Sequence, residues 1–154
     1  MSQSYSQQIK TAILADLQSL VPTTLNDAFA DDMSKVNPLD RDWKGFPSAV
    51  VLPPTVDTSE YEDWRTNLRE YTFWVAVVTK PELVQKDPTG TAIEALMDTI
   101  LNVFDQDVTL QGSSIGGVLP AVVQAPGPVS SNSVTYVIFY VVLKVKALVS
   151  ANVQ

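Results

Sequence analysis

Residues Asn67–Thr79, which read NLREYTFWVAVVT, give the strongest structural signal in the sequence. The alternation of their side chains predicts a β-strand, because successive residues of a strand point to opposite faces of a sheet. One face carries Arg69, Tyr71, Phe73, Val75 and Val77, and the other carries Leu68, Glu70, Thr72, Trp74, Ala76 and Val78. Both faces are apolar after Tyr71. We therefore predict that the far end of this strand is covered on both sides.

A second β-rich stretch lies nearer the C-terminus, over Val134–Val149. Together with Ile115–Val123 it predicts a hairpin, and the connection Gln124–Ser133 is expected to be a loop of about ten residues. Two prolines and a glycine stiffen the first half of this loop. Because residues 136–143 are apolar on both faces, the last strand is predicted to be central in its sheet.

The length of this last stretch is itself informative. Fully extended, it would span roughly 53 Å at ~3.3 Å per residue. A compact domain of this size has a radius of gyration of about 15 Å, and therefore a diameter of about 40 Å. One end of the strand is expected to bend, to stop early, or to protrude onto a neighbouring molecule.

Two amphipathic helices are predicted to pack on the sheet. The first begins near Ser4 or Ser6 and ends at Pro22, which cannot donate the next backbone hydrogen bond. The second begins at the capping pattern of Thr91 and Glu94. Their apolar stripes comprise Ile9, Ile13, Leu17, Leu20 and Val21 in the first helix, and Ile93, Leu96, Met97, Ile100, Leu101 and Phe104 in the second.

The remaining segments give weaker signals. Pro47–Leu52 predicts a short strand that ends at two prolines. Residues 23–42 predict a helical turn or two around Leu25–Phe29, followed by a loop, and Thr55–Asp63 is expected to be an exposed acidic connection. No internal repeat or long linker divides the chain. We predict one α+β domain over residues 1–154, with a mixed or mainly antiparallel sheet and two main helices packed on it.

The composition excludes several kinds of chemistry. The chain has 154 residues and a net charge of −7, from 17 acidic and 10 basic residues, and it contains neither cysteine nor histidine. A strongly acidic chain is a poor binder of the nucleic-acid backbone, although it can line a channel through which DNA slides. The missing residues remove thiol nucleophiles, disulfides, the commonest general base and the commonest transition-metal ligand. We expect no catalytic site, no cofactor and no metal.

One motif resembles the nucleophile elbow of hydrolases. Gly112–Gly116 matches the pattern G-x-S-x-G, but that elbow requires a preceding strand, a following helix and a histidine base. Here a helix is predicted before it and a strand after it, so we interpret it as a flexible turn. No Gly-Lys-Ser/Thr follows, so it is not a phosphate loop either.

Carboxylates gather at two places, where they are expected to form solvated acidic surface. The denser group contains Asp57, Glu60, Glu62 and Asp63, and the other contains Asp27, Asp31 and Asp32. A pair of carboxylates can act as acid and base or hold a hard cation. Neither group has the alternating spacing and glycine of a calcium loop.

Candidate contact residues come from the predicted loops. Trp74 is expected to belong to the core, whereas Trp43 sits in a loop, where simple packing and partner contact are equally open. The candidate partner contacts are Trp43, Phe46, Gln124, Pro126, Gly127, Pro128, Val129 and Ser130. The first residues do not have the pattern of a signal peptide, and the stretch containing Lys144 and Lys146 is too short and too charged to span a membrane as a helix.

The order of these elements resembles that of the tail terminator proteins of tailed bacteriophages. The resemblance rests on a starting helix, a short strand at Phe46–Val51, the alternation Asn67-x-Arg69-x-Tyr71-x-Phe73-x-Val75, an amphipathic helix, and a terminal hairpin that ends in a long apolar strand. It covers nearly the whole chain and depends on element order, not on an invariant chemical motif.

This resemblance implies a structural role in the virion. Such proteins have an α+β fold and form a homo-hexameric ring on the last ring of tail-tube protein. The ring stops tube growth, contacts the head-side neck or connector protein and, in contractile tails, the sheath protein. It would imply synthesis in the bacterial host cytoplasm, a final location at the head–tail junction, no membrane partner, and passage of DNA through the lumen without specific binding.

Other functions stay open from the sequence. A related structural role is that of another neck protein, such as a stopper or connector component. A different class is a non-catalytic protein- or ligand-binding module of the bacterial cell. An enzyme that uses only carboxylates, or serine and lysine, is the least favoured.

Overall fold

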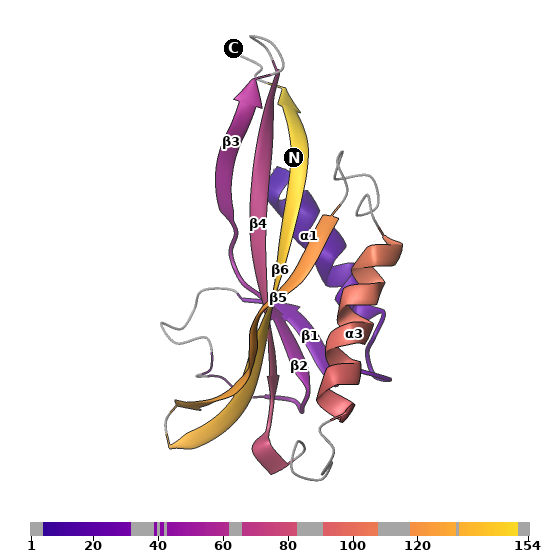
Figure 1. Ribbon diagram of the computed structural model, residues 1–154, viewed down its shortest axis with the longest axis vertical. Helices are drawn as coiled ribbons and strands as arrows, with labels where there is room; N and C mark the ends of the chain where they lie inside the picture. The colour runs from indigo at the N-terminus through magenta and orange to yellow at the C-terminus, as the bar shows by residue number, and fades with distance from the viewer. Residues whose placement is uncertain are drawn as a thin grey trace.

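The computed structural model describes residues 5–31, 39, 41, 43–61, 66–82, 91–107, 118–131 and 133–150. Two helices and six strands lie in these ranges and are labelled in Figure 1. In chain order they are α1 (Tyr5–Gln18), β1 (Asp27–Ala30), β2 (Ser48–Val51), β3 (Thr55–Tyr61), β4 (Thr66–Thr79), α3 (Thr91–Gln106), β5 (Val118–Ser131) and β6 (Val134–Ser150). The predicted α+β class is confirmed.

The strands form one mixed sheet in the order β1-β2-β4-β6-β5, and β3 also pairs with β4. Only the pair β1–β2 is parallel among the described strands. The pair β4–β6 is the longest uninterrupted one, and runs without a register shift from Thr66 opposite Ser150 to Thr79 opposite Val137. Both strands predicted most strongly from the sequence are therefore confirmed, and β6 is central as expected, between β4 and β5.

Strands β2 and β3 lie one after the other along the same edge of β4. Leu52 continues the pairing between them, since its N–H donates to the carbonyl of Trp74 at 2.9 Å. The next two residues are prolines, which have no N–H to donate, and the regular ladder stops there. The prediction that Thr55–Asp63 is a loop is wrong over Thr55–Tyr61. Acidic residues disfavour a strand in the middle of a sheet, but an edge strand tolerates them.

The segment after α1 also differs from its prediction. Asp27–Ala30 is the strand β1, parallel to β2, where a helical turn was expected. Leu25 and Ala28 are buried as a helix would also have required, so burial alone does not separate the two structures. An isolated helix of two turns is marginal, whereas pairing with β2 gives hydrogen-bond partners to the backbone groups of this segment that face β2.

Both helices cover the same face of the sheet, on the right in Figure 1. This core contains Ile9, Ile13 and Leu17 of α1, Ile100 and Phe104 of α3, and the residues Tyr71, Phe73, Val75, Val77, Phe139, Val141, Leu143 and Val145 of the two long strands. Leu20, Val21, Ile93, Leu96, Met97 and Leu101 pack at its margin. The predicted stripes are confirmed, except that α1 ends at Gln18 and not at Pro22, so Leu20 and Val21 pack from the turn that follows it.

The opposite face carries a smaller core. Its buried members are Val50, Ala76, Val78, Tyr136 and Ile138, and side chains from the segment 39–47 pack against them. The far end of β4 is therefore covered on both sides, as predicted. Trp74 is an exception: it was expected in the core, yet it is 39% exposed. It lies on the face opposite the helices, at a place that this smaller core does not cover.

The last hairpin is more regular than expected. Strand β5 continues to Ser131, and the connection to Val134 is a tight turn in which Ser133 has a φ of 64°. The predicted ten-residue loop is therefore wrong. Register shifts between Val122 and Gln124 and between Gln124 and Gly127 accommodate the proline-rich stretch, and an edge strand tolerates proline where the missing N–H would face away from its neighbour.

Strand β6 is longer than a compact domain can accommodate in a straight line, and it curves and extends past the helices. It runs from the β5–β6 hairpin at the lower left of Figure 1 to the upper tip of the molecule. At the upper end, β3, β4 and β6 extend together beyond α1 and α3. The molecule is elongated along these strands.

Candidate functional site

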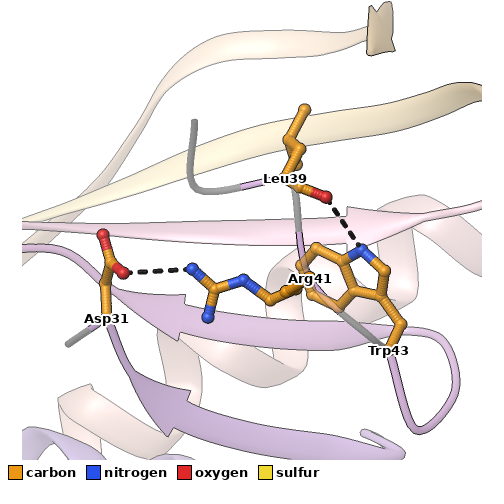
Figure 2. A network of polar contacts seen from close by, with 4 residues as sticks. All are labelled: Asp31, Leu39, Arg41 and Trp43. Atoms are coloured by element: carbon orange, nitrogen blue, oxygen red, sulfur yellow. Dashed lines mark hydrogen bonds and ion pairs between the residues drawn. The ribbon is translucent and has the colours of Figure 1, made fainter. Parts of the chain in front are cut away.

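A buried ion pair fixes the segment that precedes β2. Asp31 follows β1 directly, and its backbone N–H donates to the carbonyl of Val51 at 2.9 Å. Its side chain is 3% exposed and accepts a hydrogen bond from Nη2 of Arg41 at 3.0 Å, with 17% of the Arg41 side chain exposed (Figure 2). This corrects the expectation that Asp31 belongs to a solvated acidic surface. A carboxylate buried to this degree requires its cation.

Arg41 also lies against two aromatic rings. Its guanidinium carbon is 4.8 Å from the ring centroid of Phe29 and 5.6 Å from that of Trp43. Trp43 in turn donates a hydrogen bond from Nε1 to the carbonyl of Leu39 at 3.3 Å (Figure 2). These contacts hold the indole over the sheet face opposite the helices.

Four aromatic side chains meet there, and we call them the aromatic cluster: Phe29, Trp43, Phe46 and Tyr136. The ring centroids of Trp43 and Phe46 are 5.4 Å apart, and each lies about 6 Å from Tyr136, at 6.1 Å and 6.0 Å respectively. Nζ of Lys80, just after β4, lies 5.0 Å from the Tyr136 ring and 5.4 Å from the Phe46 ring. Trp43 and Phe46 are half-buried, so they both pack and present an edge to solvent.

The aromatic cluster places Trp43 and Phe46 on the same sheet face as Val129, one of the contact residues predicted in the hairpin. Tyr136 lies on β6 directly opposite Val129 on β5, and Val129 is 39% exposed. Gly127, Pro128 and Ser130 lie on the same stretch of β5, and the hydroxyl of Ser130 is 3.2 Å from that of Thr135 across the hairpin. Gln124 is paired with Tyr140. Pro126 lies in the register shift between Gln124 and Gly127, nearer to the hairpin turn. Trp43, Phe46 and Val129 thus share one sheet face, whereas Pro128 and Ser130 occupy the alternate positions of β5, on the other face.

Several residues of this surface were not predicted. Arg41, Lys80 and Tyr136 complete the aromatic cluster, and Tyr140 lies on the same sheet face, where its ring centroid is 5.7 Å from that of the exposed Trp74. Trp74 and Tyr140 each lie in a stretch that the sequence predicts as a strand, but nothing in the sequence pairs the two residues. Their approach across β4 and β6 required the register, which alternation does not give.

The other sequence candidates are placed as follows. Gly112–Gly116, Asp32, Glu62 and Asp63 lie outside the described residues. Asp27 accepts a hydrogen bond from the N–H of Ala28 at 3.0 Å. Asp57 and Glu60 belong to β3. Within the described ranges, no group of three or more acidic side chains is arranged to hold a metal ion.

Comparison with known proteins adds no identification. No protein-family model matches the chain, and no curated protein sequence matches it. Among the described helices, none has the length and apolar character needed to cross a membrane.

Proposed function

We propose that this chain is a structural protein of a tailed virion, a tail terminator that forms a ring on the tail tube and contacts the head-side neck. The proposal rests on the resemblance in element order and on one structural observation that supports it. The sheet extends past its helical layer at the upper end, and its other end is a curved hairpin (Figure 1). Strands that reach beyond their own core are suited to contacts with neighbouring subunits.

The surface around the aromatic cluster is a suitable contact with the tube or with the neck. It joins half-buried Trp43 and Phe46 to the exposed Val129 near the hairpin tip. Protein interfaces are enriched in such aromatic residues at their centres. The net charge of −7 supports a lumen that repels DNA and lets it pass.

The decisive experiment locates the chain in particles. Tailed particles from the cells that encode it are purified and examined by mass spectrometry and by immunogold electron microscopy. The proposal predicts the chain at the head–tail junction, and it predicts headless particles with overlong tubes after disruption of its gene. Absence of the chain from particles that contain tube and neck proteins would contradict it.

A substitution tests the contact surface. Val129→Asp is expected to leave the melting temperature nearly unchanged, because the side chain is exposed, and to prevent the joining of heads to tails in a complementation assay. The matched control is Ala121→Asp, an exposed position on the other half of β5. Normal joining with Val129→Asp would exclude this surface as the contact.

A further inference from the structure

Both described helices cover the same face of the sheet, and part of the other face is open to solvent. On that open part Trp74 is 39% exposed, and its ring centroid lies 5.7 Å from that of half-buried Tyr140. Val142 lies directly opposite Trp74 in the register, so β4 and β6 together present an apolar strip. Contact with a partner would be favourable here, because aromatic side chains remove a large apolar area from water.

An exposed cation borders this apolar strip. Lys144 on β6 is exposed and lies on the same sheet face. The residues opposite it in the register, Thr72 on β4 and Leu119 on β5, are uncharged. Glu70, the acidic residue of β4, lies opposite Lys146 instead. The open part of the sheet face therefore combines an apolar strip with a lysine that has no acidic residue directly opposite it.

The outer side of α3 has the complementary charge. Glu94, Asp98 and Asp105 are exposed there, and the helix contains no basic residue. Their spacing of four and then seven residues places them in one row along the helix. Asp105 lies in the last turn, where the helix macrodipole disfavours a carboxylate and favours a cation. A lysine from another molecule would offset both the acidic row and the dipole at this end of the helix.

We propose that the outer side of α3 of one copy docks along β4 on the open sheet face of the next copy, so that Asp105 lies beside Lys144 and Asn102 packs against Trp74. Asn102 is exposed and lies one turn before Asp105, with about 5–6 Å between their Cβ atoms. Trp74 and Lys144 are diagonal neighbours on β4 and β6, about 7–8 Å apart. The two spacings match to within the reach of a lysine side chain.

The directions of the elements agree with this contact. Helix α3 begins at the lower end of the molecule and ends higher up, in the same direction as β6 (Figure 1). Rotation about an axis parallel to the strands preserves this direction, so α3 of one copy can follow the long strands of the next. The two contact surfaces lie on opposite sides of the molecule. The contact is therefore head-to-tail, and it closes into a ring where the rotation per copy divides a full turn.

The occupant of the open sheet face is a second copy of this chain, identified by the acidic row of α3. The contact is the one between subunits of the proposed ring, and it rests on that function. It leaves the surface around Val129 to the tube or the neck. Val129 and Ala121 lie on β5, two strand spacings or about 9.5 Å from β4, and stay outside the contact.

Charge exchange between copies tests the contact. Asp105→Lys and Lys144→Glu each put like charges at every subunit boundary. Each variant alone is expected to raise the concentration at the midpoint of assembly at least about tenfold, equivalent to ~1.4 kcal/mol. In an equal mixture the two variants alternate around the ring, and every boundary then joins opposite charges. The introduced lysine meets the introduced glutamate at one boundary, and the original Asp105 and Lys144 meet at the next.

Assembly of this mixture should return to within about threefold of the unmodified chain, because the charge pairing is restored at each boundary. Sedimentation velocity or native mass spectrometry provides the measurement. Recovery on mixing also shows that both variants are folded.

Matched controls carry the same charge changes away from the contact. Glu82→Lys after β4 and Lys44→Glu before β2 are exposed positions, and they should leave the midpoint unchanged. Failure of the mixed variants to assemble, where the unmodified chain assembles, would overturn the inference. A chain that stays monomeric up to ~1 mM, a concentration at which even a weak contact forms, would overturn it as well.

The absence of cysteine from the chain permits a second, covalent test. In one molecule the sheet and the helical layer separate Lys144 from Asp105. A disulfide requires Cα atoms closer than about 7 Å, so a chain carrying both Asp105→Cys and Lys144→Cys can only join to another chain. Mild oxidation of assembled material should give a ladder of covalent multimers, whereas either single substitution should give at most dimers.

The outcomes distinguish the contact from the proposed function. Sixfold rings without the ladder would overturn the contact between α3 and the sheet face and leave the ring intact. A ladder that grows into open filaments would support the contact and contradict the closed ring. Covalent products of the double variant that stop at dimers would overturn the head-to-tail contact, and cross-linking to a different protein alone would overturn the second copy as occupant.

Discussion

Arg41 connects the segment before β2 to the end of β1. It forms an ion pair with the end of β1, lies over Phe29, and contacts the indole of Trp43. The partner carboxylate is almost inaccessible to water. The pair therefore acts as an anchor for the segment before β2. Its importance for stability lies mainly in the free energy of folding that is lost when one partner is removed.

Replacement of Arg41 tests this anchor. Arg41→Ala leaves the Asp31 carboxylate without its buried cation and removes the contact with two rings. We expect the free energy of unfolding, measured by urea denaturation, to fall by about 3 kcal/mol. Lys44→Ala, an exposed basic residue of the same segment, is the control and should change it by less than about 0.5 kcal/mol. Equal effects of the two substitutions would contradict a specific role for Arg41.

The neighbours Phe73 and Trp74 test which face of β4 is buried. Phe73 is fully buried, whereas Trp74 is 39% exposed beside Tyr140. Phe73→Ala should lower the free energy of unfolding by about 3–5 kcal/mol, because it leaves a cavity under the helices. Trp74→Ala should cost less than half as much. Similar losses at both positions would mean that the face opposite the helices is covered as well.

At the scale of elements, α3 depends on one apolar stripe. Ile100 and Phe104 are fully buried against the sheet, while Asn102 between them is exposed. Ile100→Asp should prevent stable folding, because it places an unpaired charge in the core. Asn102→Asp should leave the melting temperature within a few degrees of the original. The measurement is thermal unfolding followed by circular dichroism, and a cooperative transition with Ile100→Asp near the original temperature would refute the placement.

The elements that could be predicted are those with a long periodic pattern. The alternation over Asn67–Thr79 and the helical stripe of Ile93–Phe104 each extend over many residues. The secondary structure that each pattern favours locally is therefore also the one that buries its apolar side chains in the folded protein. Strand β1 has only four residues, and β3 is polar and acidic. Both form because β2 and β4 offer them an edge. The hairpin loop was predicted too long because Pro126 and Pro128 favour turns locally, while an edge strand with shifted register accommodates them.

The candidate contact surface was predictable only in part, for a similar reason. Trp43, Phe46 and Val129 were recognised by residue type and by their places outside the strongest elements. Tyr136, which joins them, lies in an apolar strand and gives no local sign of its position. Its role depends on a register between distant segments, which a single sequence does not contain.

At the scale of the whole molecule, elongation has a measurable consequence. A compact chain of this length has a radius of gyration of about 15 Å. Strand β6 alone would span about 56 Å if straight, and its curved path still crosses the full length of the molecule (Figure 1). Small-angle X-ray scattering, extrapolated to low concentration to remove association, should give a radius clearly above 15 Å. A value at or below 15 Å would contradict the elongation of the molecule along β3, β4 and β6.

The pairing of β4 with β6 also determines how long β4 stays unpaired along one edge during synthesis. During synthesis, β4 leaves the ribosome about seventy residues before the strand that covers one of its edges along its whole length. At bacterial rates of roughly 20 residues per second down to eukaryotic rates of about 5, this interval is on the order of 4–14 s. Throughout it, an apolar strand with an open edge is exposed to other nascent chains. We therefore expect newly made chains to engage a chaperone such as a holdase during this window, and rapid overproduction to yield inclusion bodies that diminish when translation is slowed or the temperature is lowered.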